Sequence, residues 1–180
     1  MPERSDATDR AWKLLEASCA EKMQHTSQTL DTYHKVLGGF AGAPAGLRPR
    51  RVLAFALVVK NIGFYWADAR KISHGDSLAA LFREPYVKQA DELVPGSLEL
   101  ARELVSAVWW IVSTPQTSSG DALAGLEALR RATASSDTAI AVCNDLGRIG
   151  LVAILLFARD HGMDAGGALA LMRREIEQAT

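Results

Sequence analysis

Residues 139–161 constrain the fold of this chain more than any other part of the sequence. They are apolar almost throughout, and residues 149–158 have no polar face at all. A helix that is apolar on every side must be covered on every side, so it belongs at the centre of a bundle of helices. The sequence therefore predicts a central helix over about residues 137–161.

A second helix of the same kind is predicted over about residues 49–74, around the apolar run of residues 52–59. The other apolar positions recur at helical spacing, and no window shows the two-residue alternation of a strand. We therefore predict an all-α fold: a single globular helical bundle of six or seven helices, with two nearly all-apolar central helices at about residues 49–74 and 137–161.

The chain is expected to form one all-helical domain over residues 1–180, because nothing in it requires a second core. Apolar positions three or four residues apart predict one long first helix from about residue 6 to Leu37. Gly38 and Gly39 are expected to end it, followed by a flexible Gly/Ala/Pro connection over about residues 38–48. Further on, Ser97, Asp137 and Asp164 are expected to cap helices.

Charge and cysteine usage narrow the class of protein. Twenty basic and 21 acidic residues give a formal net charge of −1, so we do not expect a nucleic-acid partner. Two isolated cysteines form no disulfide framework, and the polar N-terminus is no secretory signal. The uncharged apolar runs are shorter than the roughly 20 residues that span a bilayer. We expect a cytoplasmic protein without membrane insertion, and its Ala, Leu and Arg content is typical of a bacterial genome rich in G and C.

Three polar residues interrupt the helix predicted over about residues 137–161, namely Asn144, Asp145 and Arg148. Their spacing places all three on one face. Charges close to a core are costly unless they are paired, so this group marks either a structural ion pair or the wall of a pocket. In the structural interpretation, Asp145 pairs with Arg148 or with Lys60 and fixes the register of the helices.

The ligand-binding interpretation adds a similar interruption in the helix predicted over about residues 49–74, formed by Lys60, Asn61 and Tyr65. If the two central helices pack together, six side chains converge on one cavity for an anionic or amide-bearing ligand. These candidate ligand-binding residues are Lys60, Asn61, Tyr65, Asn144, Asp145 and Arg148.

No set of residues predicts catalysis, a metal site or a cofactor. The four histidines match no zinc or haem pattern, and the cysteines lie among apolar residues that oppose a reactive thiolate. We therefore assign no catalytic residue, no metal ligand and no cofactor. Arg48, Arg50 and Arg51 cluster at the start of a predicted helix, where the helix dipole disfavours cations. They are either a phosphate-binding patch or exposed arginines that keep the helix end soluble.

Trp109 and Trp110 are adjacent and so point about 100 degrees apart on a helix, which leaves one of them at the rim of the core. Each is either a core residue or an anchor in a protein interface. The sequence as a whole favours a non-catalytic helical binding or regulatory module that acts through protein–protein contact or self-association as a homo-oligomer. The alternative is a small-molecule-binding bundle, either a binding protein or an enzyme, that uses the six polar residues above.

Overall fold

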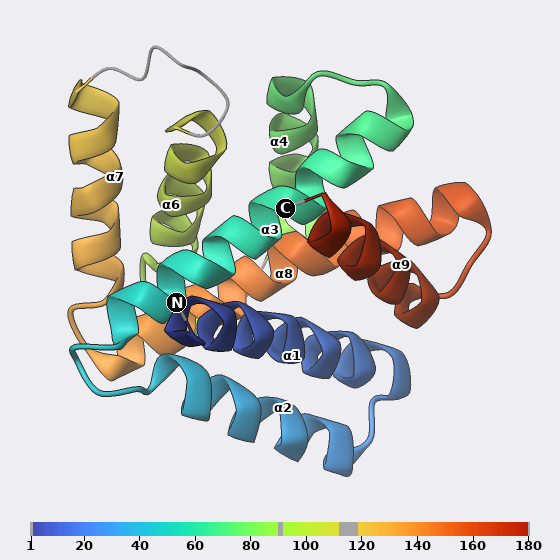
Figure 1. Ribbon diagram of the computed structural model, residues 1–180. Helices are drawn as coiled ribbons and strands as arrows, with labels where there is room; N and C mark the ends of the chain where they lie inside the picture. Colours follow the sequence, from blue (N-terminus) through green and yellow to red (C-terminus); the bar gives the residue numbers. More distant parts are fainter. Residues whose placement is uncertain (1, 90–91, 112–118, 180) are drawn as a thin grey trace.

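The computed structural model describes residues 2–89, 92–111 and 119–179. These ranges contain helices and no strand, so the predicted all-α class is confirmed (Figure 1). The described ranges hold nine helices rather than six or seven, including one of only four residues. The helices are α1 (Pro2–Gln24), α2 (Ser27–Ala41), α3 (Arg48–Arg70), α4 (His74–Arg83), α5 (Pro85–Lys88), α6 (Ser97–Ile111), α7 (Ser119–Ala132), α8 (Ser136–His161) and α9 (Ala165–Gln178).

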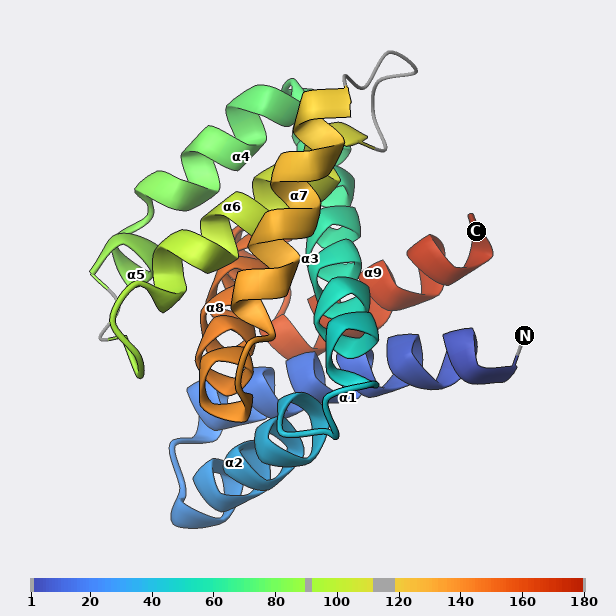
Figure 2. The same ribbon diagram turned by 90° about the vertical axis from the view of Figure 1, so that its left-hand side faces the viewer.

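Helices α3 and α8 pack along each other at the centre, and the other helices surround them (Figures 1 and 2). Residues 149–158 of α8, which have no polar face, are covered by neighbouring helices. Ile149, Ala153 and Ile154, for example, have no exposed surface. The two helices approach closely at Gly150, where an added Cβ would lie 3.2 Å from Val59 of α3. The absence of a side chain there lets the central pair pack tightly.

By length and composition alone, α3 and α8 could each cross a membrane. In the structure, 56% of the apolar window of α3 and 78% of that of α8 are buried inside the protein. Burial by neighbouring helices is the behaviour of core helices in a globular bundle.

The predicted long first helix is two helices, and this prediction was wrong. The chain turns at His25, which has a positive φ of 47°. Thr26 then caps α2: its side chain accepts from the Thr29 backbone N–H, and the Thr29 side chain accepts in return from the Thr26 backbone N–H, at 3.1 Å each. The apolar spacing continued through the break, but Met23 is 55% exposed and does not belong to the core.

The connection between α2 and α3 is shorter than predicted. Gly38 and Gly39 lie inside α2, which continues to Ala41, so the connecting residues are 42–47 and not 38–48. Phe40 and Ala41 are buried, and their packing keeps the chain helical past the two glycines.

Several helix ends also differ from the expected positions. α3 ends at Arg70 with Lys71 in the left-handed conformation, and a new helix, α4, begins at His74 after Ser73 as N-cap. Ser135, not Asp137, caps α8. Asp164 caps α9 as predicted, because its carboxylate accepts the Gly167 N–H at 2.8 Å. The N-terminal end of α1 and the C-terminal end of α9 lie on the same side of the molecule (Figure 2).

Candidate functional site

Asp145 has no exposed surface, so the polar group on α8 begins inside the core. Its strongest contact is with Ser97 at the start of α6, whose hydroxyl donates to Asp145 Oδ2 at 2.6 Å. Ser97 was expected to cap its helix, but its side chain is directed to the carboxylate instead. The contact joins α6 to α8 through two residues that lie 48 positions apart in the sequence.

Asn144 and Arg148 connect the same group to two further helices, and one of these contacts a third. Tyr33 of α2 donates to Asn144 Oδ1 at 2.8 Å, and the Asn144 amide lies 3.4 Å from Asp145 Oδ1. The Arg148 guanidinium lies 5.4 Å from the centre of the Tyr86 ring of α5, and the Lys22 ammonium of α1 lies 4.4 Å from the same ring. We call Tyr33, Tyr86, Ser97, Asn144, Asp145 and Arg148 the polar network.

The ion pair expected between Asp145 and Arg148 is weak in geometry. Arg148 Nε lies 4.0 Å from Asp145 Oδ1, and the Arg148 side chain is 25% exposed. Burial raises the pKa of Asp145, and the Ser97 hydrogen bond, Arg148 and Asn144 only partly offset this. Burial likewise raises the pKa of Tyr33. Desolvation therefore outweighs charge pairing in the polar network.

Lys60 does not pair with Asp145. It is 6% exposed, and its ammonium lies 5.0 Å from the centre of the Phe64 ring, one turn further along α3. It forms no ion pair with any residue that the structure describes. Burial lowers its pKa, since an ammonium that leaves water loses hydration.

The other two candidate residues on α3, Tyr65 and Asn61, lie neither in the polar network nor beside Lys60. Tyr65 packs against Phe157 of α8, with ring centres 5.5 Å apart. Burial raises its pKa, as does the charge of Glu175 of α9, and Arg174 partly offsets this. Asn61 lines a surface groove. The structure thus brings Asn144, Asp145 and Arg148 together, but places Lys60, Asn61 and Tyr65 in three separate environments. None of the first three lines the groove or the smaller cavity described below.

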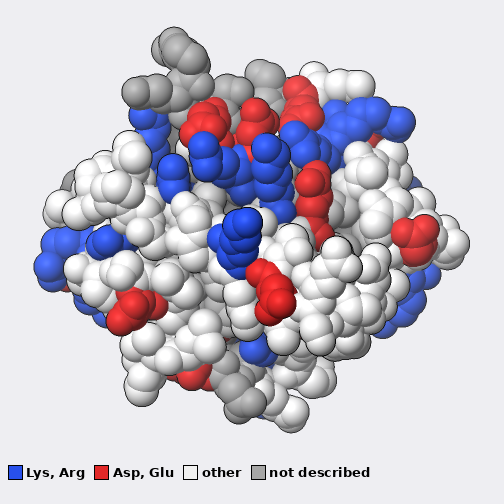
Figure 3. Space-filling model, turned by 90° about the horizontal axis from the view of Figure 1, so that it is seen from below, with Lys and Arg blue, Asp and Glu red and all other residues white. Residues whose placement is uncertain are grey.

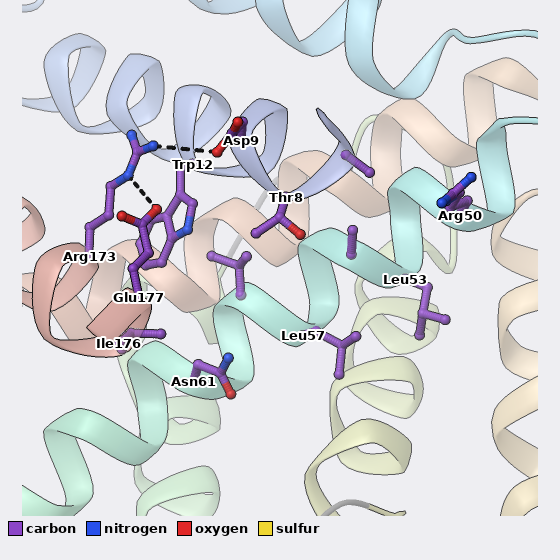
Figure 4. A pocket seen from close by; sticks show the side chains of 13 residues that line it. Thr8, Asp9, Trp12, Arg50, Leu53, Leu57, Asn61, Arg173, Ile176 and Glu177 are labelled. Carbon is purple, nitrogen blue, oxygen red and sulfur yellow. Dashed lines mark hydrogen bonds and ion pairs between the residues drawn. The ribbon is translucent and has the colours of Figure 1, made fainter. Parts of the chain in front are cut away.

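The groove lies between α1, α3 and α9 and has a volume of about 950 Å³ (Figure 4). Leu53 and Leu57 of α3 and Ile176 of α9 line it, and all three are half-buried. Arg50 lies at one end, and Arg173 and Glu177 of α9 lie at the other, as Figure 4 shows. Sequence reasoning singled out two of its lining residues, Asn61 and Arg50, but assigned them to other sites and missed the groove itself.

Arg173 joins three carboxylates at its end of the groove. Its guanidinium lies 2.8 Å from Glu16, 2.9 Å from Glu177 and 3.7 Å from Asp9. It also lies 5.8 Å from the centre of the Trp12 ring. The carboxylate side chains remain 46 to 53% exposed, so these charges are still in contact with water. Of the three, Asp9 and Glu177 line the groove, whereas Glu16 lines a smaller cavity between α1 and α9.

The other two arginines of the predicted cluster are used inside the protein. Arg51 donates to the Gly39 and Phe40 carbonyls at 2.8 and 3.2 Å, in the last turn of α2. Arg48 donates to the Thr133 carbonyl at 3.1 Å, just beyond α7. Carbonyls at a helix C-terminus lack partners within their own helix and attract cations. This offsets the unfavourable placement of the arginines at the start of α3.

Surface charge shows no large region of one sign on the face seen in Figure 3. Lys and Arg side chains lie among Asp and Glu side chains along one edge of that face, and most of the remainder is uncharged. Intermixed charges of both signs do not make the positive field that binds nucleic-acid phosphates.

Trp109 is fully buried, the core position that the sequence left as one of two interpretations. Its Nε1 donates to the His74 carbonyl at 2.8 Å, and its ring packs edge-on against Phe64. Gly63 makes room for it, since an added Cβ there would lie 2.3 Å from the indole. The side chain of Trp110 lies outside the described residues, so its expected interface role has no structural account.

A smaller cavity of about 360 Å³ lies between α1 and α9, and Cys19 lines it. Burial raises the pKa of this thiol to about 11, which opposes a nucleophilic role. Burial raises the pKa of Cys143 as well. Among the described residues, no three His, Cys, Asp or Glu side chains come together as a metal site would need.

Comparison with known proteins adds no relative: no family model, no curated protein and no solved structure matches the chain.

Proposed function

We propose that this protein is a non-catalytic helical binding module that takes a segment of a partner protein in the groove between α1, α3 and α9. The observation that carries the proposal is the apolar strip of Leu53, Leu57 and Ile176, which stays half-exposed along an open groove of about 950 Å³. Contiguous apolar surface rimmed by charges is typical of a protein interaction site.

The polar network supports the proposal by contrast. Tyr33 of α2 donates to Asn144 at 2.8 Å and Ser97 of α6 donates to Asp145 at 2.6 Å, so these two side chains of α8 already have partners from neighbouring helices. Buried polar groups that are satisfied in this way stabilise a fold and have little capacity left for a ligand. The groove is therefore the stronger candidate for a binding site.

The proposal is tested by native mass spectrometry of the protein recovered gently from its own host cells. Leu57→Arg places a charge on the apolar wall of the groove. Leu30→Arg is the matched control, because Leu30 lies on α2, is 42% exposed and does not line the groove. A thermal melt of each variant verifies that it folds.

We expect the wild type and Leu30→Arg to retain an additional mass of protein size, and Leu57→Arg to lose it. Retention of that mass by a folded Leu57→Arg variant would overturn the proposal. A retained ligand of a few hundred daltons, in place of a protein, would also overturn it and would favour a small-molecule-binding bundle.

A further inference from the structure

The smaller cavity continues the groove along the same two helices. The groove lies against residues 7–12 of α1 and 173–177 of α9, and the cavity lies against residues 16–24 and 164–173. Arg173 lines both of them. We infer that the smaller cavity is a second binding site, which takes a basic side chain of the partner segment held in the groove. This inference rests on the proposed function.

The cavity offers an apolar surface for the stem of such a side chain. Cys19 and Leu169 line it and are buried, and Ala20 of α1 lines it beside them. Met23 is 55% exposed and lies at its rim. The volume of about 360 Å³ is in the range of ligand pockets. Lysine and arginine side chains bury their methylene stems against apolar surface of this kind and leave the charged tip near water.

Carboxylates outnumber cations in the cavity. Its charged lining residues are Glu16, Asp164 and Arg173. The guanidinium of Arg173 lies 2.8 Å from Glu16, but it also lies 2.9 Å from Glu177, which is outside the cavity. One cation thus serves carboxylates on both sides of it, and the cavity keeps an excess of negative charge that attracts a further cation.

Asp164 is the carboxylate with capacity for that cation. Its Oδ1 accepts the Gly167 N–H at 2.8 Å as the N-cap of α9, whereas its Oδ2 forms no hydrogen bond or ion pair with the residues that the structure describes. The Asp164 side chain is exposed, and its charge adds to burial in raising the pKa of Cys19, so it lies close to the buried thiol. An ammonium or guanidinium would form a charge-assisted hydrogen bond with Oδ2.

A basic side chain fits the cavity better than other occupants do. An acidic group would meet two carboxylates, and the N-terminus of α9, which attracts anions, is already occupied by Asp164. A small organic cation has the right chemistry but binds alone. A segment in the groove reaches the cavity at Arg173, so its basic side chain binds at high effective concentration.

The first test uses side-chain analogues and needs no partner. Propylguanidinium, an analogue of arginine, and butyrate, an acid of similar length, are titrated separately into the ¹⁵N-labelled full-length protein. The backbone amide shifts of residues 16–24 and 164–170 report binding. Asp164→Asn removes the charge and retains a residue that caps helices. Asp137→Asn is the matched control, because Asp137 also lies in the first turn of a helix and does not line the cavity.

We expect propylguanidinium to shift amides on both walls of the cavity, with a Kd on the order of millimolar, and butyrate to leave them unchanged. Binding should be at least about threefold weaker in Asp164→Asn and unchanged in Asp137→Asn. Equal shifts with the two analogues would overturn the inference, as would unchanged binding in a folded Asp164→Asn variant.

The second test measures the partner retained in native mass spectrometry. Met23→Arg adds a cation at the exposed rim of the cavity, and Met23→Glu adds a carboxylate. Leu30→Arg is again the control, because it adds a cation outside the cavity. We expect Met23→Arg to retain at least about twofold less partner than Met23→Glu or Leu30→Arg. Equal retention by the two Met23 variants would overturn the inference.

The inference and the proposed function fail in different ways. If a partner that depends on Leu57 is retained but the cavity binds neither analogue, the inference is wrong and the binding module stands. If no such partner is retained, the proposed function falls. The assignment of the basic side chain to a partner segment then falls with it, even if propylguanidinium binds in the cavity.

Discussion

The polar network and the groove both contain carboxylate side chains, but these are buried in the first and exposed in the second. In the polar network, Asp145 has no exposed surface and is held by Ser97 at 2.6 Å. In the groove, Asp9 and Glu177 share Arg173 and remain 53 and 46% exposed. The first arrangement consumes its hydrogen-bonding capacity within the chain, and the second leaves capacity for a partner. A cluster of polar residues is thus informative about function only once its partners are known.

The largest predicted difference between the two regions is in stability. Asp145→Ala leaves the buried Ser97 hydroxyl without an acceptor and opens a void, and we expect it to lower the free energy of unfolding by about 3 kcal/mol. Asn61→Ala in the groove is expected to change it by less than about 0.5 kcal/mol. Urea denaturation measures both. An equal loss of the free energy of unfolding in the two variants would contradict this difference between the two regions.

Lys60 belongs to neither region and offers a second test of what burial costs. In Lys60→Met, an apolar side chain of similar length replaces an ammonium whose contact within the described residues is the Phe64 ring. We expect it to raise the free energy of unfolding at pH 7 by about 1 kcal/mol. Because burial lowers the pKa of Lys60, the unfolded chain binds more protons between the folded pKa and 10.5.

Wild-type stability should therefore rise with pH in that window, relative to Lys60→Met. Denaturation of both proteins across the window gives the difference. A difference that does not change with pH, or a loss of stability in Lys60→Met, would show that the ammonium is well solvated or paired.

Asp145 should show the opposite sign. Its folded pKa is raised above the ordinary 3.8, so the folded state binds more protons just above that value, and its contribution to stability falls as pH rises through the folded pKa. Asp145→Asn cannot ionise and should lack this dependence. The free energy of unfolding of wild type minus that of Asp145→Asn is expected to decrease from pH 4 upward. An increase would indicate a carboxylate stabilised by charge pairing.

The last prediction concerns an apolar residue of the groove. Leu57→Ala removes a half-buried side chain, and we expect it to lower the free energy of unfolding by about 1 kcal/mol while weakening retention of the partner. Leu30→Ala serves as the control and should leave the partner bound. If Leu57→Ala retained the partner as well as wild type does, the apolar strip would not be the binding site.

The fold class and the central helices could be predicted because they follow from apolar periodicity within single segments. Residues 149–158 have no polar face, and that alone requires burial. The break at His25 could not be found from periodicity, since the three- and four-residue spacing continues through it. Its available signal was Thr26 and Thr29, which form a capping box.

The candidate site was harder to predict because it depends on how helices face one another. Lys60 and Asn61 are adjacent, yet one side chain is buried beside Phe64 and the other lines the groove. The sequence gives their angular separation on the helix but not which neighbour each one meets. The groove also combines Asp9, Leu57 and Glu177, which lie far apart in the chain and carry no local signal.

The most direct measurement is photo-crosslinking in the host cells from two positions, one in each region. A photoreactive residue replaces Leu57 in the groove in one protein and Arg148, a part-exposed member of the polar network, in another. We predict an adduct of protein mass from position 57 and none from position 148. An adduct from position 148 and none from position 57 would contradict the assignment of binding to the groove and of structure to the polar network.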